Sequence, residues 1–134
     1  MQIEYREGYK YQLWESFGVK TALLGYDIET HFIKLSPDGM LLLRAGYASD
    51  GPSGPTWDTK DSLPGAFVHD AGYQLIREGL LPLGYRGYFD ELFYDILREC
   101  GMSAIRAWLW RKAVVGFARD AALPENDRKV LTAP

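Results

Sequence analysis

The most informative stretch for the architecture reads Thr30-His31-Phe32-Ile33-Lys34-Leu35-Ser36-Pro37-Asp38-Gly39-Met40-Leu41-Leu42-Leu43-Arg44. Two short apolar runs flank a Ser-Pro-Asp-Gly sequence, whose last two residues favour a tight turn because glycine adopts positive φ at no steric cost. The stretch therefore predicts a β-hairpin. Its histidine, His31, is expected at the surface of that hairpin.

The residues before this hairpin carry the same kind of signal. Tyr9, Tyr11 and Leu13 alternate with polar residues, which is the period-two pattern of a half-buried strand. We therefore expect residues 1–47 to form a β half made of antiparallel hairpins or a small sheet.

After the hairpin the chain changes character twice. Residues 48–63 are rich in proline and glycine, which exclude a helix and predict a loop. From Pro64 the apolar residues recur with a helical period, so residues 64–122 are expected to form a helical half. Capping residues and terminating glycines divide it into three helices, over about 64–78, 87–100 and 104–122. Residues 123–134 are polar and predict a loosely held tail.

Together these signals predict an α+β fold, in which a small antiparallel sheet precedes three helices and the first two helices form an antiparallel pair. A chain of 134 residues is one domain's worth, so we expect one domain over residues 1–134. In the third helix an apolar stripe at helical spacing is expected to face the core. It consists of Ile105, Trp108, Leu109, Lys112, Val115 and Phe117.

Composition and charge exclude several classes of protein. Hydrophobic residues make up 47% of the chain and charged residues 25%, which is typical of a globular domain and not of a disordered one. A net charge of -3 offers no basic surface to nucleic acid. The single cysteine, Cys100, excludes an internal disulfide and a zinc site of several thiolates. We expect no transmembrane segment and no signal peptide, because the apolar runs are short and the first residues lack a basic-then-apolar pattern.

Candidate chemistry is concentrated in Val68-His69-Asp70-Ala71-Gly72-Tyr73, on the first predicted helix. His69 and Tyr73 are one helical turn apart and therefore lie on one face. Asp70 points in a neighbouring direction, about 100° round the helix. Such a helix can aim a histidine at a water molecule and a carboxylate at a metal ion bound beside it. Histidine suits proton abstraction near neutral pH when a second group fixes its tautomer.

Asp90, on the second predicted helix, is the candidate for that second group. A short turn joins the two helices, so we expect them to be antiparallel and to bring Asp90 within reach of His69. Asp90 lies in an aromatic and apolar stretch, where a buried carboxylate needs partners to offset its desolvation. Asp95 on the same helix is the rival candidate, although its spacing also suits the rim of the helix.

The loop before the first helix supplies candidate metal ligands. A hard cation such as Ca²⁺ takes six to eight oxygen ligands, often carboxylates mixed with backbone carbonyls. Asp50 offers one carboxylate, the backbone from Gly51 offers carbonyls, and Asp70 offers a second carboxylate. We therefore expect these three residues to bind Ca²⁺ or another divalent metal.

The same residues also suit a purely structural role, and the sequence leaves both interpretations open. His69 would then be a half-buried histidine, Asp70 a charge on the exposed face of a helix, and Tyr73 a core aromatic. Trp57, in the loop rich in proline and glycine, has no role that the sequence indicates.

The order Asp50-Gly51, His69-Asp70, Tyr73, Asp90 resembles the active site of secreted phospholipases A2, especially the short bacterial and fungal branch. The resemblance implies that His69 is the general base for water, that Asp90 orients it, and that Tyr73 supports the hydrogen-bond network. It also implies Ca²⁺ at Asp50 and Asp70. The match covers roughly residues 50–97. This chain departs from those enzymes in having one cysteine in place of their disulfides, and in beginning with a β half that they lack.

Taken as a whole, the chain resembles a family of small proteins from tailed phages and their prophages. Those proteins share an Asp-Gly-x-Ser-x-Pro-type loop, then His-Asp-x-x-Tyr and a later aspartate on a helix. Here the loop reads Asp50-Gly51-Pro52-Ser53-Gly54-Pro55 and fits that pattern loosely. The resemblance implies a phage or prophage origin and a location in the host cytoplasm or the virion, but it names no reaction.

These resemblances imply a small, phage-type, metal-dependent hydrolase with a phospholipid or another ester as its substrate. The alternative is a non-enzymatic component of the virion or of tail assembly, which has a vestigial or structural metal site and binds other phage structural proteins. An HD-type phosphohydrolase is a third interpretation, but it requires an all-helical fold and a further helical histidine, whereas His31 lies in the predicted hairpin.

Overall fold

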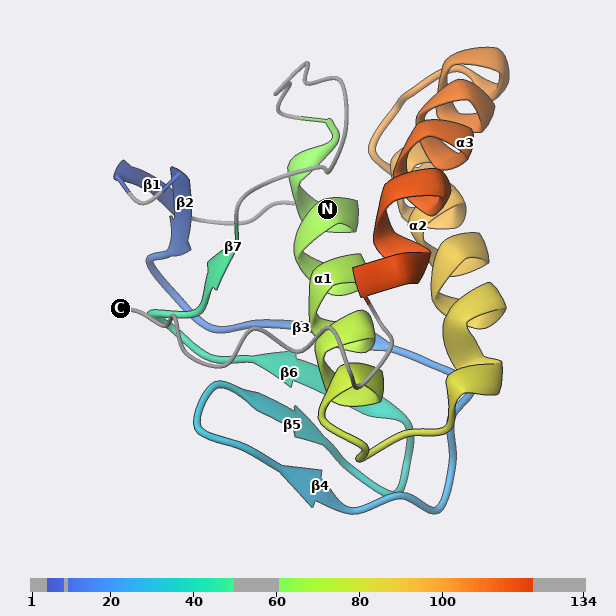
Figure 1. Ribbon diagram of the computed structural model, residues 1–134. Helices are drawn as coiled ribbons and strands as arrows, with labels where there is room; N and C mark the ends of the chain where they lie inside the picture. The colour runs from blue at the N-terminus through green and yellow to red at the C-terminus, as the bar shows by residue number, and fades with distance from the viewer. Residues whose placement is uncertain (1–4, 9, 50–60, 122–134) are drawn as a thin grey trace.

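The computed structural model describes residues 5–8, 10–49 and 61–121, which form two small antiparallel sheets followed by three helices (Figure 1). The predicted α+β fold is confirmed. The first sheet has the strand order β1-β2-β7 and consists of β1 (Tyr5–Gly8), β2 (Lys10–Leu13) and β7 (Ala48–Ser49). The second has the order β3-β6-β5-β4 and consists of β3 (Phe17–Lys20), β4 (Ile28–Glu29), β5 (Ile33–Leu35) and β6 (Met40–Leu43).

The predicted hairpin is present as β5 and β6. Leu35 pairs with Leu41 and Ile33 with Leu43, and all four side chains are buried. Gly39 in the turn has a φ of 92°, and a Cβ there would collide with the carbonyl oxygen of Thr21. Glycine at this position is therefore required both by the backbone conformation and by the close approach of the neighbouring segment.

The three helices begin and end close to their predicted limits. They are α1 (Leu63–Arg77), α2 (Arg86–Glu99) and α3 (Ala104–Ala121), with a short 3-10 turn η1 (Leu83–Tyr85) before α2. Pro64 lies in the first turn of α1, where its missing N–H costs no hydrogen bond. Gly79 and Gly101 follow α1 and α2 with positive φ, which ends each helix as the sequence predicts.

One predicted boundary and one predicted helix cap need correction. β7 (Ala48–Ser49) lies in the segment expected to be loop, because it pairs with β2 and adds a third strand to the first sheet. Ser62 occupies the N-cap position of α1, but its side chain makes no capping hydrogen bond. The remainder of the predicted loop up to residue 60, and the predicted tail from residue 123, lie outside the described residues.

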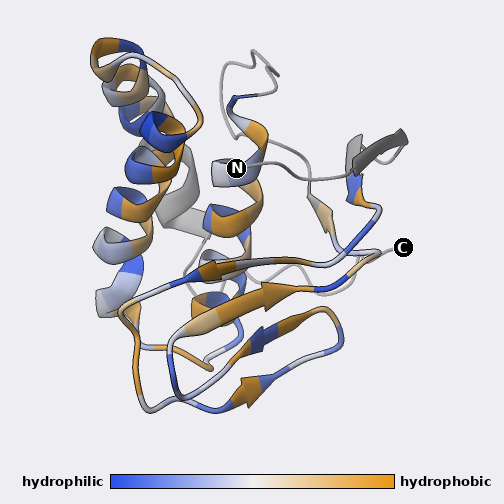
Figure 2. Cartoon of the chain, turned by 180° about the vertical axis from the view of Figure 1, so that it is seen from behind, coloured by the Kyte–Doolittle hydropathy of each residue, from blue (hydrophilic) through white to orange (hydrophobic). Residues whose placement is uncertain are grey.

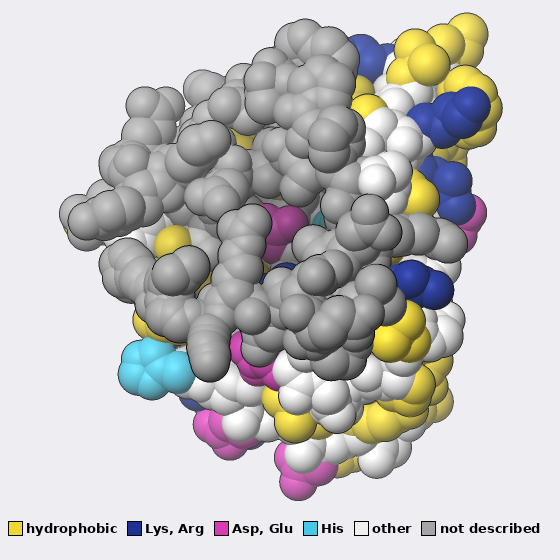
Figure 3. All heavy atoms as spheres, viewed as in Figure 1, with side chains coloured by type: hydrophobic (Ala, Val, Ile, Leu, Met, Phe, Trp, Pro, Cys, Tyr) yellow, Lys and Arg dark blue, Asp and Glu magenta, His cyan; other side chains and the backbone are white. Residues whose placement is uncertain are grey.

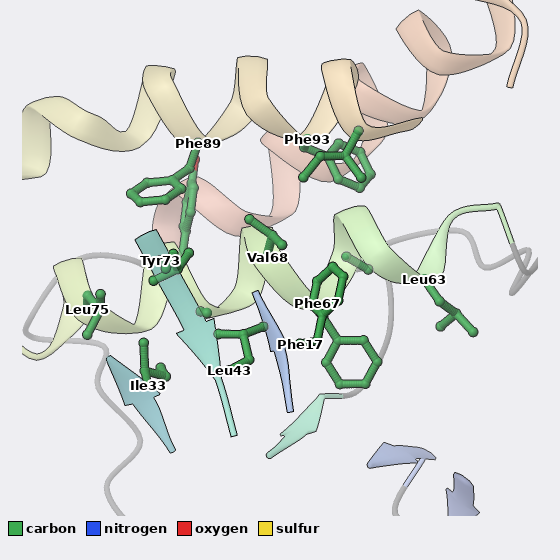
Figure 4. Packing of buried hydrophobic residues seen from close by; sticks show 14 of the residues in the cluster. Phe17, Ile33, Leu43, Leu63, Phe67, Val68, Tyr73, Leu75, Phe89 and Phe93 are labelled. Carbon is green, nitrogen blue, oxygen red and sulfur yellow. The ribbon is translucent and has the colours of Figure 1, made fainter. Parts of the chain in front are cut away.

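α1 lies between the four-stranded sheet and α2 (Figures 1 and 4). Its buried side chains reach both neighbours: Figure 4 shows Ile33 and Leu43 of the sheet on one side of α1, and Phe89 and Phe93 of α2 on the other. Figure 2 shows hydrophilic residues on the outer side of α2 and hydrophobic residues on the side toward α1. The functional residues predicted on α1 and α2 therefore lie on two helices that pack directly against each other.

The predicted core face of α3 is wrong. Ile105, Trp108 and Leu109 are 76%, 50% and 55% exposed, and Lys112 is also exposed. The buried residues are Ala107, Trp110 and Val114, on the side where α3 packs against α2. Both sides of the helix carry apolar residues, so the apolar period alone could not distinguish them. The side chain of Phe117 lies outside the described part.

Candidate functional site

Asp90 on α2 is contacted by two side chains of α1. Nε2 of His69 lies 2.8 Å from Oδ1 of Asp90, and the hydroxyl of Tyr73 donates to the same oxygen at 2.7 Å. The rings of His69 and Tyr73 stack with their centroids 4.3 Å apart, as expected for residues one turn apart on a helix. The predicted contact between His69 and Asp90 is confirmed, and Tyr73 joins it.

These three side chains are almost completely removed from solvent. His69 is 2% exposed, Tyr73 3% and Asp90 0%. A carboxylate in such surroundings is stable only with hydrogen-bond donors, and these two side chains supply them. An ionised Asp90 can only accept, so Nε2 of His69 is the donor in this hydrogen bond. In the neutral imidazole, Nδ1 then has the lone pair. The arrangement therefore presents a histidine whose tautomer is set by a carboxylate from the neighbouring helix.

Glycines on α1 let α2 approach closely enough for this contact. A Cβ on Gly72 would overlap the ring of Phe89, and one on Gly65 would lie 3.1 Å from the ring of Phe93. The ring of Phe93 also packs 5.3 Å from that of His69. The spacing of the two glycines places both on the face of α1 that meets α2. They hold the backbones of the two helices close together on either side of His69.

Asp70 lies on a different side of α1 and is only half-buried. Burial, and to a smaller extent the negative charge of Asp70, raises the pKa of Tyr47 well above its usual value. The Tyr47 hydroxyl stays protonated and donates to Oε1 of Gln74 at 3.2 Å, one turn along α1 from Asp70. Tyr47 directly precedes β7, which packs against α1. The strand that leads to Asp50 thus runs beside the helix that carries Asp70.

Only one of the predicted metal ligands can be placed. Asp50 and Gly51 lie outside the described residues, so the structure does not test whether they meet Asp70. Within residues 5–8, 10–49 and 61–121, no group of three or more His, Cys, Asp or Glu side chains could hold a metal ion. The described donor set consists of Asp70 alone, whose carboxylate suits a hard cation.

Three other residues considered from the sequence, Asp95, His31 and Cys100, lie outside the contact of His69 with Asp90. Asp95 is exposed, so it does not compete with Asp90 as the partner of His69. His31 is exposed as expected, with its ring against Phe32. Burial raises the pKa of the Cys100 thiol, which disfavours the reactive thiolate.

Three residues at the site, Tyr47, Gly65 and Gly72, have no functional role that the sequence indicates. Tyr47 is the last residue of the predicted β half, and only contacts between distant elements bring it beside Asp70 and Gln74. Gly65 and Gly72 fall within the helix predicted over residues 64–78. Their separation by two helical turns was a signal for close helix approach, although it does not say which helix approaches.

Comparisons with known protein families, with curated proteins and with solved structures found nothing that matches this chain. The likeness to phospholipases A2 and to phage proteins therefore rests on the motif residues themselves. A separate finding concerns membranes: in the part of the chain that the structure describes, no helix has both the length and the apolar character needed to cross one.

Proposed function

We propose that this chain is a small hydrolase in which His69 removes a proton from a water molecule and Asp90 orients His69. The observation that carries the proposal is the buried hydrogen bond between Nε2 of His69 and Oδ1 of Asp90, made between two helices. A carboxylate on one ring nitrogen leaves the other as proton acceptor, and it stabilises the imidazolium that forms when a proton is taken up.

Tyr73 supports this arrangement as a positioning residue. Its hydroxyl donates to the same carboxylate oxygen that faces His69, and its ring stacks on the His69 ring. The two contacts restrict rotation of Asp90 and of His69 together. In the proposal they hold Nδ1 in one direction, which lowers the entropic cost of aligning the base with water.

The proposal includes a divalent cation, Ca²⁺ by preference, held by the carboxylates of Asp50 and Asp70 and by backbone carbonyls from Gly51. Two features of the chain support it: Asp70 follows His69 directly, and Tyr47 links α1 to the segment just before Asp50. Such a cation, when bound, supplies a positive charge that polarises a substrate carbonyl and stabilises negative charge on its oxygen.

The substrate class follows from the resemblance to phospholipases A2 and is an ester of a lipid. In the same proposal the protein acts in a phage or prophage setting, in the host cytoplasm or in the virion. His69 would deliver the activated water to the ester carbonyl, and the imidazolium would return the proton to the departing alcohol oxygen. This sequence leaves a free fatty acid and a lysolipid as products.

The test is release of fatty acid from mixed phospholipid vesicles by the purified chain in the presence of Ca²⁺. Wild type is expected to release fatty acid, and His69→Ala to lose activity by about a hundredfold or more. His31→Ala is the matched control, because His31 is the exposed histidine of the hairpin. No release by wild type, or equal release by wild type and His69→Ala, would contradict the proposal.

The depth of His69 supports a second candidate function, a non-enzymatic component of a phage virion or of tail assembly. At 2% exposure, His69 can serve solely to join α1 to α2 through Asp90. Any metal site would then be structural or vestigial, and the partners would be other phage structural proteins. Recovery of the protein in stoichiometric amount from virions, with assembly unchanged in Asp70→Asn, would favour this candidate over the hydrolase.

A further inference from the structure

The outward face of α3 exposes large apolar side chains over two successive turns. We call it the α3 stripe and define it as Ile105, Trp108, Leu109 and Lys112. The ammonium of Lys112 lies 4.9 Å from the centre of the Trp108 ring. Figure 3 shows hydrophobic and basic side chains gathered at the upper right of the molecule, over α2 and α3. Contiguous apolar side chains on a surface mark a site of interaction more often than isolated ones do.

Ion pairs flank the stripe. Arg106 contacts Asp61 at 3.1 Å, and Arg111 contacts Glu91 on α2 at 2.7 Å. On a helix, residues 106 and 111 fall on opposite sides of the line through 105, 109 and 112. An apolar centre within a polar, charged rim is the usual anatomy of a protein–protein interface.

The charge balance of this rim bears on the kind of partner. Each flanking arginine has its own carboxylate, so Lys112 is the cation that the stripe itself contributes. A face that binds an anionic membrane or nucleic acid carries several such cations. A nearly neutral rim instead allows two identical faces to meet without repulsion between like charges.

We propose that the α3 stripe is the interface between two copies of this chain. The two α3 helices would run antiparallel about a two-fold axis near Trp108 and Leu109, so that each copy contributes the same residues. Lys112 of one copy then meets the Ile105 end of the other, where Asp61 lies beside Arg106. The apolar residues bury one another at the centre, and at the edge each Lys112 lies next to the ion pair of Asp61 with Arg106 on the other copy, so that it shares the Asp61 carboxylate.

The proposal does not depend on hydrolase activity, because the stripe lies on the side of α3 away from α2 and the His69–Asp90 contact. Its readout is assembly. Loss of enzymatic activity and loss of dimerisation can therefore be observed separately.

The test is analytical ultracentrifugation of the full chain over a wide range of concentrations, with Leu109→Glu as the disrupting variant. Wild type is expected to dimerise, and Leu109→Glu to raise the dimer dissociation constant by about tenfold or more, which is the effect of a central interface residue. Leu24→Glu is the matched control, because Leu24 is 64% exposed in the segment between β3 and β4. Circular dichroism of both variants would verify that they fold.

Three outcomes would overturn the proposal. The first is a wild type that stays monomeric throughout the concentration range. The second is a dimer that Leu109→Glu and Leu24→Glu weaken equally. The third is a monomer that sediments with phosphatidylglycerol vesicles and loses this binding in Leu109→Glu, which would assign the stripe to a lipid surface.

A cross-linking experiment tests whether the proposed two-fold axis passes near Leu109. Leu109→Cys in a Cys100→Ser background places one reactive thiol near the proposed axis, and a short bis-maleimide is expected to join two copies. Leu24→Cys in the same background is the control and is expected to remain unlinked. Cross-linking of the control as efficiently as of the Leu109 variant would contradict the proposed axis.

Discussion

The α1–α2 interface and the outer face of α3 violate the usual distribution of side chains in opposite ways. Between α1 and α2, a carboxylate and an imidazole lie in an apolar core, with Asp90 fully buried. On α3, a tryptophan, a leucine and an isoleucine face solvent. The first arrangement costs desolvation and the second leaves apolar area in water.

The two regions differ in whether contacts within the chain compensate the unusual side chains. The buried polar group is compensated within the chain by two hydrogen bonds, so its cost is already offset and its geometry is narrowly defined. In the proposed hydrolase, this defined geometry allows Asp90 to orient His69. The apolar side chains on the outer face of α3 remain exposed in the described chain, and the proposed contact with a second copy would remove their surface from water. An exposed apolar face of this kind is typical of a surface that binds another protein.

Removing the carboxylate is expected to give the largest effect. Asp90→Ala leaves His69 and Tyr73 buried without their acceptor, so the free energy of unfolding should fall by about 3–5 kcal/mol. Urea denaturation followed by circular dichroism measures this. Asp95→Ala is the control, because Asp95 is exposed on the same helix, and it should change stability by less than about 0.5 kcal/mol. Equal effects of the two variants would remove the distinction between buried and surface carboxylates.

The two tryptophans of α3 lie on its two faces, Trp110 on the buried face and Trp108 on the exposed face. Trp110→Ala should cost about 3–5 kcal/mol, because Trp110 is buried against the rest of the chain. Trp108→Ala should cost less than about 0.5 kcal/mol when unfolding is measured at the lowest workable protein concentration. A larger loss in Trp108→Ala than in Trp110→Ala would mean that the faces are assigned the wrong way round.

The hydrogen bond from Tyr73 offers a milder perturbation of the buried site. Tyr73→Phe keeps the ring stacked on His69 but removes the donor to Asp90, so stability should fall by about 1.5–3 kcal/mol. Thermal unfolding monitored by calorimetry would detect the difference. Tyr94→Phe on α2 is the comparison, since Tyr94 is half-buried and makes no hydrogen bond within the described residues. An equal loss of stability in Tyr73→Phe and Tyr94→Phe would contradict a stabilising hydrogen bond from Tyr73 to Asp90.

An apolar substitution at Gly72 tests the close contact between α1 and α2 and leaves the hydrogen bonds of Asp90 in place. Gly72→Ala places a methyl group against the ring of Phe89, so we expect a loss of about 1–3 kcal/mol. Gly116→Ala in α3 has open space and should have the opposite sign, stabilising the chain by about 0.5–1 kcal/mol through helix propensity. Chemical denaturation of both variants provides the comparison. Stabilisation by Gly72→Ala would show that the helices are not in close contact there.

Several features followed from local sequence. The turn at Gly39 requires positive φ, and Gly79 and Gly101 end their helices for the same reason, so short segments determine these elements. The contact of His69 with Asp90 needed only the helical period and a short connection between two helices. The helical period and the short connection both act over a few residues, where backbone geometry allows few conformations.

The sequence did not predict the buried face of α3 or the position of Tyr47, because the local pattern allowed more than one arrangement. α3 has apolar residues on both sides. The side that is buried against α2 is the one with Ala107, Trp110 and Val114. Tyr47 carried no local sign of its role, because its partner Gln74 lies on another element. In both cases the deciding contact joins residues that are distant along the chain.

Local sequence was enough to predict a β half followed by three helices, the hairpin turn at Gly39 and the face of α1 shared by His69 and Tyr73, because these depend on backbone sterics and helical period. Tertiary structure alone decided which face of α3 is buried, where Tyr47 lies and how deeply His69 and Asp90 are enclosed. Those outcomes depend on packing between elements far apart in sequence, where side-chain volume selects among arrangements of equal local quality.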